Sequence, residues 1–423
     1  MFTTGVIINL LEILTVAWVL GAFFSRFGLP VMLGELLAGV ILGPMLLDLV
    51  HDSHALALLA DLGIFFVMFH TGMEMDPKEL LRHIKPSLSV ALGGFTLPFA
   101  LGMAVTWAFG GTLYQSLFMG MGISITAIAV QAVVLHSLHI HRTDVGHVII
   151  GAAIADDILS LVALSILLGL AKTGTISVAA VSWVMFKVAA FFGATIIAGH
   201  FVVPRLTRGL KDEGGKGFAF AMVTALTMSY LAEIAGLHLI MGAFLAGQFV
   251  RKEIMDEKVY RKIGDRFFAL SYGFLVPIFF ATLSLHLNLQ WSWPFALFGL
   301  AVVVAAIVGK LFGAGLGAAV FGFNRWECTM VGFGMNGRGA VELVVAAVVI
   351  KLSDELLASG AIDAPLLTET QFSALVLMAF VTTFLAPLAL RWAVRRACSA
   401  SDAASFCTLW DRHQATGGPM KLE

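Results

Sequence analysis

The sequence predicts an all-α, polytopic membrane protein with about 13 transmembrane helices, inverted repeats and two broken helices that cross each other. Three observations predict this fold: 59% of the 423 residues are hydrophobic and only 13% are charged, the mean hydropathy is +0.94, and long apolar runs recur along the chain. A soluble domain needs more polar surface to cover its core, whereas lipid removes that requirement. The net charge of −1 gives no basic excess for nucleic-acid binding.

Thirteen apolar runs are the candidate spans. A helix needs about 20 residues to cross the hydrocarbon core, and the ninth run, which is short and nearly touches the eighth, fits this length least well. The runs cover residues 4–22, 30–49, 55–74, 86–109, 114–138, 146–171, 177–204, 217–235, 237–252, 266–288, 292–322, 326–350 and 370–394.

The distribution of Lys and Arg predicts the orientation, because cytoplasmic loops carry an excess of these residues. With the N-terminus outside, the inside loops and the C-terminal tail hold 21 of them, and the outside loops hold only Lys172 and Lys351. We therefore expect a periplasmic N-terminus and a cytoplasmic C-terminus. Residues 1–396 form the transmembrane domain in this interpretation, and residues 397–423 form a short cytoplasmic tail.

Two short segments indicate an internal repeat. Residues 32–39 and 240–247 agree in identity or residue type at five of eight positions, including both glycines. They lie seven spans apart, an odd offset, so the two copies run in opposite directions across the membrane. The alternative is chance, since small residues four apart recur in many membrane helices. The repeats would cover about residues 30–171 and 237–394.

Charged residues inside the spans mark the candidate site, because charges there are costly and usually functional. Asp156 and Asp157 lie near the middle of the sixth run, and Lys310 lies near the middle of the eleventh. Adjacent helical residues point about 100° apart, so one aspartate can face Lys310 while the other faces a cavity. One paired acid and one available acid suit a proton-coupled cation site. A purely structural polar pair is disfavoured, since a single Ser or Asn would join helices at less cost.

Two spans contain helix-breaking sequence at the same depth. Residues 122–127 include Ser and Thr, and residues 332–339 include four glycines, which are poor helix formers. Unwound backbone at mid-membrane is tolerated only where it lines a cavity or is buried in protein, so two facing broken helices are predicted. Arg338 and Glu342 are four residues apart and are predicted to form a structural pair.

Four histidines, His136, His139, His141 and His147, lie in or beside a predicted cytoplasmic loop. The favoured interpretation is a solvated loop, although imidazoles titrate in the physiological range. The spacing of these histidines indicates no specific metal site. The sequence predicts no cofactor and no metal beyond a transported ion.

Together these residues resemble the monovalent cation:proton antiporter-2 family, which includes NapA-type sodium/proton antiporters and Kef-type potassium efflux systems. The resemblance covers about residues 4–394. Besides Asp156, Asp157 and Lys310, it is carried by the segments Pro30…Gly34-Glu35…Gly39…Gly43-Pro44, Gly72-Met73-Glu74, Gly242…Ala246-Gly247 and Gly334-Met335-Asn336…Arg338-Gly339.

The resemblance implies a homodimer in the lipid of the bacterial inner membrane, with a mobile core domain that moves against a dimerisation scaffold. Asp157 would bind the ion or the proton. Asp156 would pair with Lys310, a possible proton carrier in an electrogenic cycle. The crossing of the broken helices would be lined by Ser124, Thr126, Met335 and Asn336. The protein would then exchange sodium or lithium for protons in pH homeostasis.

The transported ion stays open at this stage. Sodium-type members often carry Glu directly after the Arg-Gly pair, where this chain has Ala340, so potassium/proton exchange is the alternative. Kef-type members tend to show Gln-Asp at the paired position, so Asp156 favours sodium or lithium. An intramembrane aspartyl protease is disfavoured, because its two aspartates come from different helices. A channel is disfavoured by the inverted repeat and the buried acids.

Overall fold

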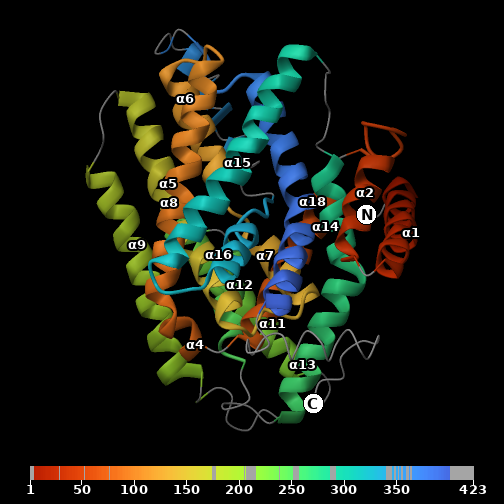
Figure 1. Cartoon of the computed structure of the whole chain (residues 1–423). Helices are drawn as coiled ribbons and strands as arrows, with labels where there is room; N and C mark the ends of the chain where they lie inside the picture. Colours follow the sequence, from red (N-terminus) through yellow and green to blue (C-terminus); the bar gives the residue numbers. More distant parts are fainter. Residues whose placement is uncertain are drawn as a thin grey trace.

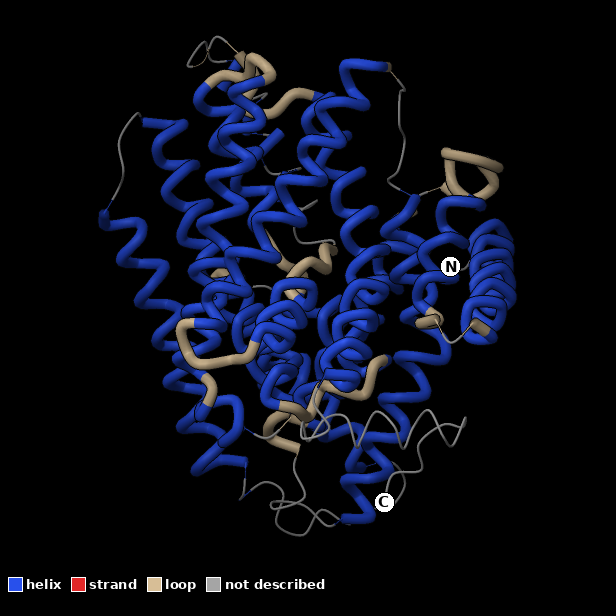
Figure 2. Tube along the Cα trace, in the orientation of Figure 1, coloured by secondary structure: helices blue, strands red, loops and turns tan. Residues whose placement is uncertain are grey.

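The regular secondary structure of the computed structural model is entirely helical in the part of the chain that it describes, as Figure 2 shows. The described residues are 4–27, 29–51, 53–75, 77–173, 178–203, 205, 216–237, 239–250, 257–285, 292–339, 345–346, 349–350, 352–353, 356–358, 362 and 364–400. Within them, 10 helical stretches are long and apolar enough to cross a membrane. The prediction of an all-α polytopic membrane protein is confirmed.

These long stretches coincide with ten of the predicted spans. They are α1 (Thr4–Arg26), α3 (His54–Glu74), α5 (Ile84–Ala108), α6 (Leu113–Ser124) with α7 (Ile128–Ser137), α8 (Asp144–Thr173), α9 (Val178–Ile197), α11 (Lys216–Ala235), α13 (Glu257–Leu270) with η2 (Ser271–Leu275) and α14 (Val276–Leu285), α15 (Trp293–Ala319) and α18 (Glu369–Ala400). Shorter helices lie in the other three predicted spans: α2 (Met32–Leu42), α12 (Leu239–Gly247) and α16 (Arg325–Gly334). The helices α4 (Pro77–Arg82) and η1 (Ala198–Val202) complete the order.

The tenth predicted span begins earlier than expected, at Glu257 rather than near residue 266. The added segment is amphipathic: Val259, Ile263 and Phe267, four residues apart, are buried, and most of the residues between them are not. A polar face lowers the average hydropathy of such a segment, so an apolar run does not reveal it. The π-helical turn η2 follows α13 and ends shortly before Pro277. Proline has no backbone N–H to donate, and its ring clashes with the carbonyl group four residues earlier, so the regular α-helical hydrogen bonds are interrupted here.

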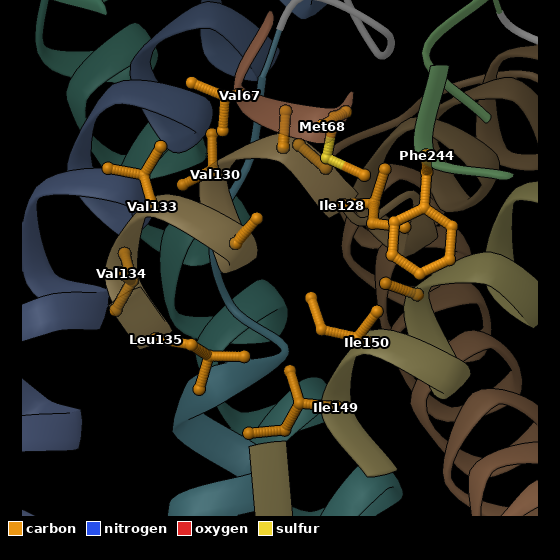
Figure 3. Close-up of a cluster of buried hydrophobic side chains, with 14 of the residues drawn as sticks. Val67, Met68, Ile128, Val130, Val133, Val134, Leu135, Ile149, Ile150 and Phe244 are labelled. Carbon is orange, nitrogen blue, oxygen red and sulfur yellow. The ribbon is translucent and has the colours of Figure 1, made fainter. Parts of the chain in front are cut away.

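The helices pack in two groups. The first bundle contains α5, α6, α7, α8, α15, α16 and α18, and the second bundle contains α1, α2, α3, α11, α12, α13, η2 and α14. In Figure 1 the α1–α2 pair lies at the right edge, whereas α5 and α8 lie on the left beside α9. Apolar side chains of α3, α7, α8 and α12 fill the boundary between the bundles, among them Val67, Ile128, Ile149 and Phe244 (Figure 3).

The two segments that indicate a repeat lie in α2 and α12 and pack in the same way. A Cβ added at Gly34 would meet the backbone of α1, and one at Gly242 would meet the backbone of α11. A Cβ at Gly39 would meet the backbone of α14, and one at Gly247 would meet that of α3. In both copies, the first glycine packs against the helix before it in the chain. The second glycine of α2 packs against α14, which comes after α12, and the second glycine of α12 packs against α3, which comes after α2. This exchange is what twofold pseudo-symmetry produces, although the repeat boundaries stay a prediction.

We expect Gly39→Ala to lower the thermal unfolding temperature of the purified protein. The new methyl group would overlap the carbonyl oxygen of Ala281 on α14, and forcing such an overlap costs about 1–3 kcal/mol. The control is Gly193→Ala on α9, where a Cβ would meet no atom within 4 Å. A Gly39→Ala protein as stable as the Gly193→Ala protein would show that α2 and α14 are not in this close contact.

Candidate functional site

The two predicted helix breaks are present, and they touch each other. Helix α6 ends at Ser124 and α7 begins at Ile128, while α16 ends at Gly334 and residues 335–339 are not helical. The amide N–H of Ala127 donates to the carbonyl oxygen of Gly337 at 3.1 Å. The hydroxyl of Thr126 donates to the carbonyl oxygen of Met335 at 3.5 Å. Short non-helical segments are visible in the middle of the bundle in Figure 2. The crossing therefore places unwound backbone from both spans at one buried point.

Lys310 on α15 and Asp156 on α8 meet beside this crossing. The Nζ atom of Lys310 lies 3.4 Å from Oδ2 of Asp156, and both side chains are 0% exposed. The buried guanidinium of Arg338 adds a favourable electrostatic interaction with the Asp156 carboxylate. A buried charge without a partner is very unfavourable, and opposite charges with further polar contacts offset that cost. The geometry is the pairing that the sequence predicts.

Asp157 lies on another face of α8. On that helix Ile154, Ile158 and Leu161 pack against side chains of α9, α11 and α12. Asp157 is three residues after Ile154 and four before Leu161, so it shares their face. The residue is 9% exposed, which leaves it slightly more accessible than Asp156. The two aspartates are thus directed to different sides, one toward Lys310 and the other toward the second bundle.

The remaining residues predicted to line the crossing are buried there. Ser124 uses its hydroxyl within α6, where Oγ donates to the carbonyl of Gly120 at 2.7 Å. Asn336 donates from Nδ2 to the carbonyl of Gly332 at 2.9 Å, and its Oδ1 atom accepts no hydrogen bond from the described residues. Asn336 and Thr382 also contribute to the wall of an otherwise apolar cavity of about 330 Å³. Asn336 therefore has a buried side-chain oxygen with no hydrogen-bond donor among the described residues, whereas the hydroxyl of Ser124 has a structural contact.

Arg338 is 0% exposed at the end of the second break. Its backbone is held by Thr383 of α18, whose hydroxyl accepts from the N–H of Arg338 at 2.9 Å and donates to its carbonyl at 2.9 Å. The predicted partner, Glu342, lies outside the described residues, so this pair stays a prediction. Arg338 interacts electrostatically with Asp156, which links the break to the ion pair.

The histidine-rich segment is not the solvated loop that its position indicates. A single carboxylate, that of Glu74 at the end of α3, lies 3.7 Å from His70 Nδ1, 3.5 Å from His136 Nε2 and 3.4 Å from His141 Nε2. Arg142 reaches its other oxygen at 3.2 Å, and the Glu74 side chain is only 10% exposed. Glu74 belongs to the second bundle, whereas His136 lies on α7 of the first bundle, and His141 and Arg142 lie in the loop after α7. The cluster therefore joins the two bundles at the predicted cytoplasmic end.

His141 gives this cluster a predicted pH dependence. Burial, followed by the neighbouring His136 and Arg142, lowers the pKa of His141 well below its ordinary value of about 6.5. As the pH falls below about 6.5, the unfolded chain binds a proton here that the folded chain does not, so stability is lost toward acid pH.

We therefore expect His141→Gln to weaken the fall in the free energy of unfolding between about pH 7.5 and about pH 5.5, by at most about 1.4 kcal/mol per pH unit. The measurement is the unfolding temperature of the variant and the wild type across this pH range. His51→Gln is the control. His51 lies just before the N-terminal end of α3, away from the Glu74 cluster at the C-terminal end, and its side chain is 65% exposed. An unchanged pH slope in the His141 variant would contradict the expectation.

Two polar residues at the crossing escape the sequence analysis. Gln131 on α7 is 0% exposed and donates from Nε2 to the carbonyl of Gly337 at 3.0 Å. Thr383 holds Arg338 from α18, as described above. The signal for Gln131 is a lone amide in the apolar segment 128–135, but its partner depends on which helix faces it.

The chain is similar to known proteins along most of its length. The family model described as "Sodium/hydrogen exchanger, transmembrane" matches residues 13–396. The Na(+)/H(+)-K(+) antiporter GerN of Bacillus cereus is 29% identical over 374 residues, covering 88% of this chain and 92% of that protein. A Na(+)/H(+) antiporter of Enterococcus hirae is 28% identical over 393 residues, covering 92% and 98%. The solved structure of MjNhaP1 from Methanocaldococcus jannaschii superposes with a TM-score of 0.60 at 17% identity, covering 92% of this chain and 98% of that one.

Proposed function

The chain belongs to the sodium/hydrogen exchanger family of multi-pass cation/proton antiporters, and from this premise we propose that it exchanges sodium or lithium for protons by an electrogenic cycle. It is a transporter and not an enzyme. The proposal places it in the bacterial inner membrane, with the N-terminus periplasmic and the C-terminus cytoplasmic, where it would serve pH homeostasis.

One observation carries the proposal: two adjacent buried aspartates lie beside the crossing of two broken helices, and one of them, Asp156, contacts Lys310. A dehydrated monovalent cation needs oxygen ligands and a compensating negative charge. Asp157, the Asn336 side-chain oxygen and the carbonyl groups of the breaks are the candidates to supply them. Protonation of Asp157 would neutralise the same charge when the ion is absent, so one carboxylate would serve the ion and the proton in alternation.

The division into two bundles supports alternating access by movement of one against the other. In this proposal, the first bundle is the mobile core domain that carries the aspartates, and the second bundle is the scaffold. The apolar side chains at their boundary form few directional contacts, which favours sliding. The Glu74 cluster would hold the bundles together at one end during part of the cycle. The scaffold of a homodimer would stay fixed in the lipid, and α1 offers exposed apolar side chains such as Trp18 and Phe23 for it.

A transport assay tests the function. Purified protein in liposomes with an imposed pH gradient is expected to dissipate that gradient on addition of sodium or lithium, as reported by a pH-gradient dye, with empty liposomes as control. A response to sodium and lithium but not to potassium would support the proposal. No response to any of the three ions would contradict it.

Potassium/proton exchange on the same scaffold is the second candidate, because the printed name of the Bacillus cereus relative includes potassium. A potassium response equal to the sodium response in the same liposomes would favour this candidate.

A further inference from the structure

A second group of imidazoles and carboxylates lies apart from the aspartate site, between α4 and the first turn of α8. Side-chain ligand atoms of Glu79, His83 and Asp144 all lie within 4.8 Å of one another. His147, one turn into α8, stacks beside His83 with ring centroids 5.9 Å apart and planes inclined by 12°. Both histidines are at least nine-tenths buried, whereas the Asp144 side chain is 74% exposed.

The hydrogen bonds of the two rings fix which nitrogen is available. Nδ1 of His83 lies 2.8 Å from the carbonyl oxygen of Glu79, and Nδ1 of His147 lies 2.8 Å from that of Thr143. A carbonyl can only accept, so each Nδ1 carries the hydrogen and donates it. In each neutral ring Nε2 is then left with a lone pair. Metal-binding histidines commonly show this arrangement, in which the distal nitrogen donates to a backbone carbonyl.

The lone pair of His83 faces a group that cannot donate to it. Its Nε2 atom lies 3.4 Å from Oδ1 of Asp144, and a carboxylate is an acceptor only. A cation between these two acceptors, either a proton or a metal ion, would make their contact favourable. Around a tetrahedral zinc ion, with ligand bonds of about 2.0–2.2 Å, neighbouring ligand atoms are about 3.3–3.6 Å apart. The separation of His83 from Asp144 fits this range, and Glu79, whose ligand atom lies within 4.8 Å of both, would complete the site by a small movement of its side chain.

We propose that His83 Nε2, Asp144 and Glu79 bind a divalent transition metal of the zinc class, with water as the fourth ligand on the exposed side of Asp144. The mixture of imidazole and carboxylate ligands suits zinc, nickel or cobalt rather than magnesium or calcium, which prefer oxygen ligands alone. Glu79 also contacts Arg82 at 3.5 Å, but that arginine side chain is 74% exposed, so the contact is weak and can be displaced.

The site would join α4 and the start of α5 to the helix that carries Asp156 and Asp157. All of its ligands come from the first bundle or from α4, so metal binding would brace that bundle internally and would not lock the two bundles together. The sequence predicts no metal beyond a transported ion, and it does not reveal this cluster, since residues 79 and 83 lie on a different segment from residue 144. The inference is independent of the transported ion, since binding can be measured without transport.

The test is equilibrium dialysis of the purified, chelator-treated full chain in detergent against zinc chloride, after removal of any affinity tag, with zinc measured by atomic absorption. We expect one zinc ion per chain, and a loss of affinity of about 10-fold or more in both His83→Gln and Asp144→Asn. Cobalt bound in place of zinc is expected to give the intense visible absorption of a tetrahedral site, and excess magnesium is not expected to displace either metal.

Two controls separate the alternatives. His51→Gln removes another histidine–carboxylate contact, that of His51 with Asp48 at 3.0 Å, and is expected to leave zinc binding unchanged. His141→Gln alters the Glu74 cluster and is also expected to leave it unchanged. If His83→Gln fails to fold, Asp144→Asn at an exposed position decides alone. Wild-type protein that binds no zinc, so that only a proton bridges the pair, or binding that is lost in His141→Gln instead, would overturn the proposal.

Discussion

Asp157→Asn is expected to reduce sodium/proton exchange in liposomes by about 100-fold or more, which corresponds to about 2.7 kcal/mol or more of lost stabilisation. An amide can neither release a proton in this pH range nor neutralise a dehydrated cation. Asp157 lies on the face of α8 that is directed away from Lys310, so the substitution leaves the Lys310–Asp156 contact in place. The measurement is the initial rate of gradient dissipation after addition of sodium.

The matched control is Asp61→Asn on α3, the same chemical change within a predicted span but away from the helix crossing. It is expected to retain most of the exchange rate. Asp157→Glu keeps the charge and should retain measurable exchange with altered apparent affinity. Appreciable sodium/proton exchange by the Asp157→Asn protein would show that another group carries the ion.

Lys310→Gln is expected to leave exchange either absent or electroneutral. If sodium binding separates Asp156 from Lys310, the released ammonium can lose its proton, and two protons then move for each sodium ion. A glutamine in its place leaves only the proton of Asp157, so no net charge is transferred per cycle. The measurement pairs current recording on a solid-supported membrane with the pH-gradient dye assay on the same protein.

Folding must be separated from transport in this experiment, because removing one partner of a buried ion pair costs about 3–5 kcal/mol. The double variant Lys310→Gln, Asp156→Asn leaves no unpaired charge and is expected to be more stable than the single variant. Lys187→Gln is the matched control, since Lys187 lies in a predicted span but on an exposed face, 3.5 Å from a backbone carbonyl. Exchange with wild-type current in the Lys310→Gln protein would exclude Lys310 as a proton carrier.

Local composition predicts the helices of this fold well, because lipid requires long apolar segments and excludes unsatisfied backbone. The breaks at residues 125–127 and 335–339 were predictable for the same reason, from glycine and hydroxyl residues in otherwise apolar spans. The amphipathic helix α13 was not, because its polar face cancels its apolar one.

Some contacts between distant residues could likewise be predicted from the sequence, and others could not. A contact of Lys310 with one of the two aspartates could be predicted because opposite charges at one depth have few other partners, and the resemblance to the antiporter family implied that the partner is Asp156. The hydrogen bonds of Gln131 and Thr383 could not, because neutral polar groups accept many partners and only the packing of the helices selects one. The burial of His136 and His141 was missed because the end of α7 and the loop after it pack against Glu74 of α3, and local sequence does not reveal such a contact.

The contact of Asp156 with Lys310 also has a consequence for the synthesis of the protein and its insertion into the membrane. The two residues are 154 positions apart, and at about 5–20 residues per second the lysine is synthesised about 8–30 s after the aspartate. Throughout that interval α8 has entered the membrane with two carboxylates and no ammonium to meet them. The carboxyl groups of Asp156 and Asp157 must therefore stay protonated, or α8 must remain beside water or the insertion machinery, until α15 has been synthesised and inserted.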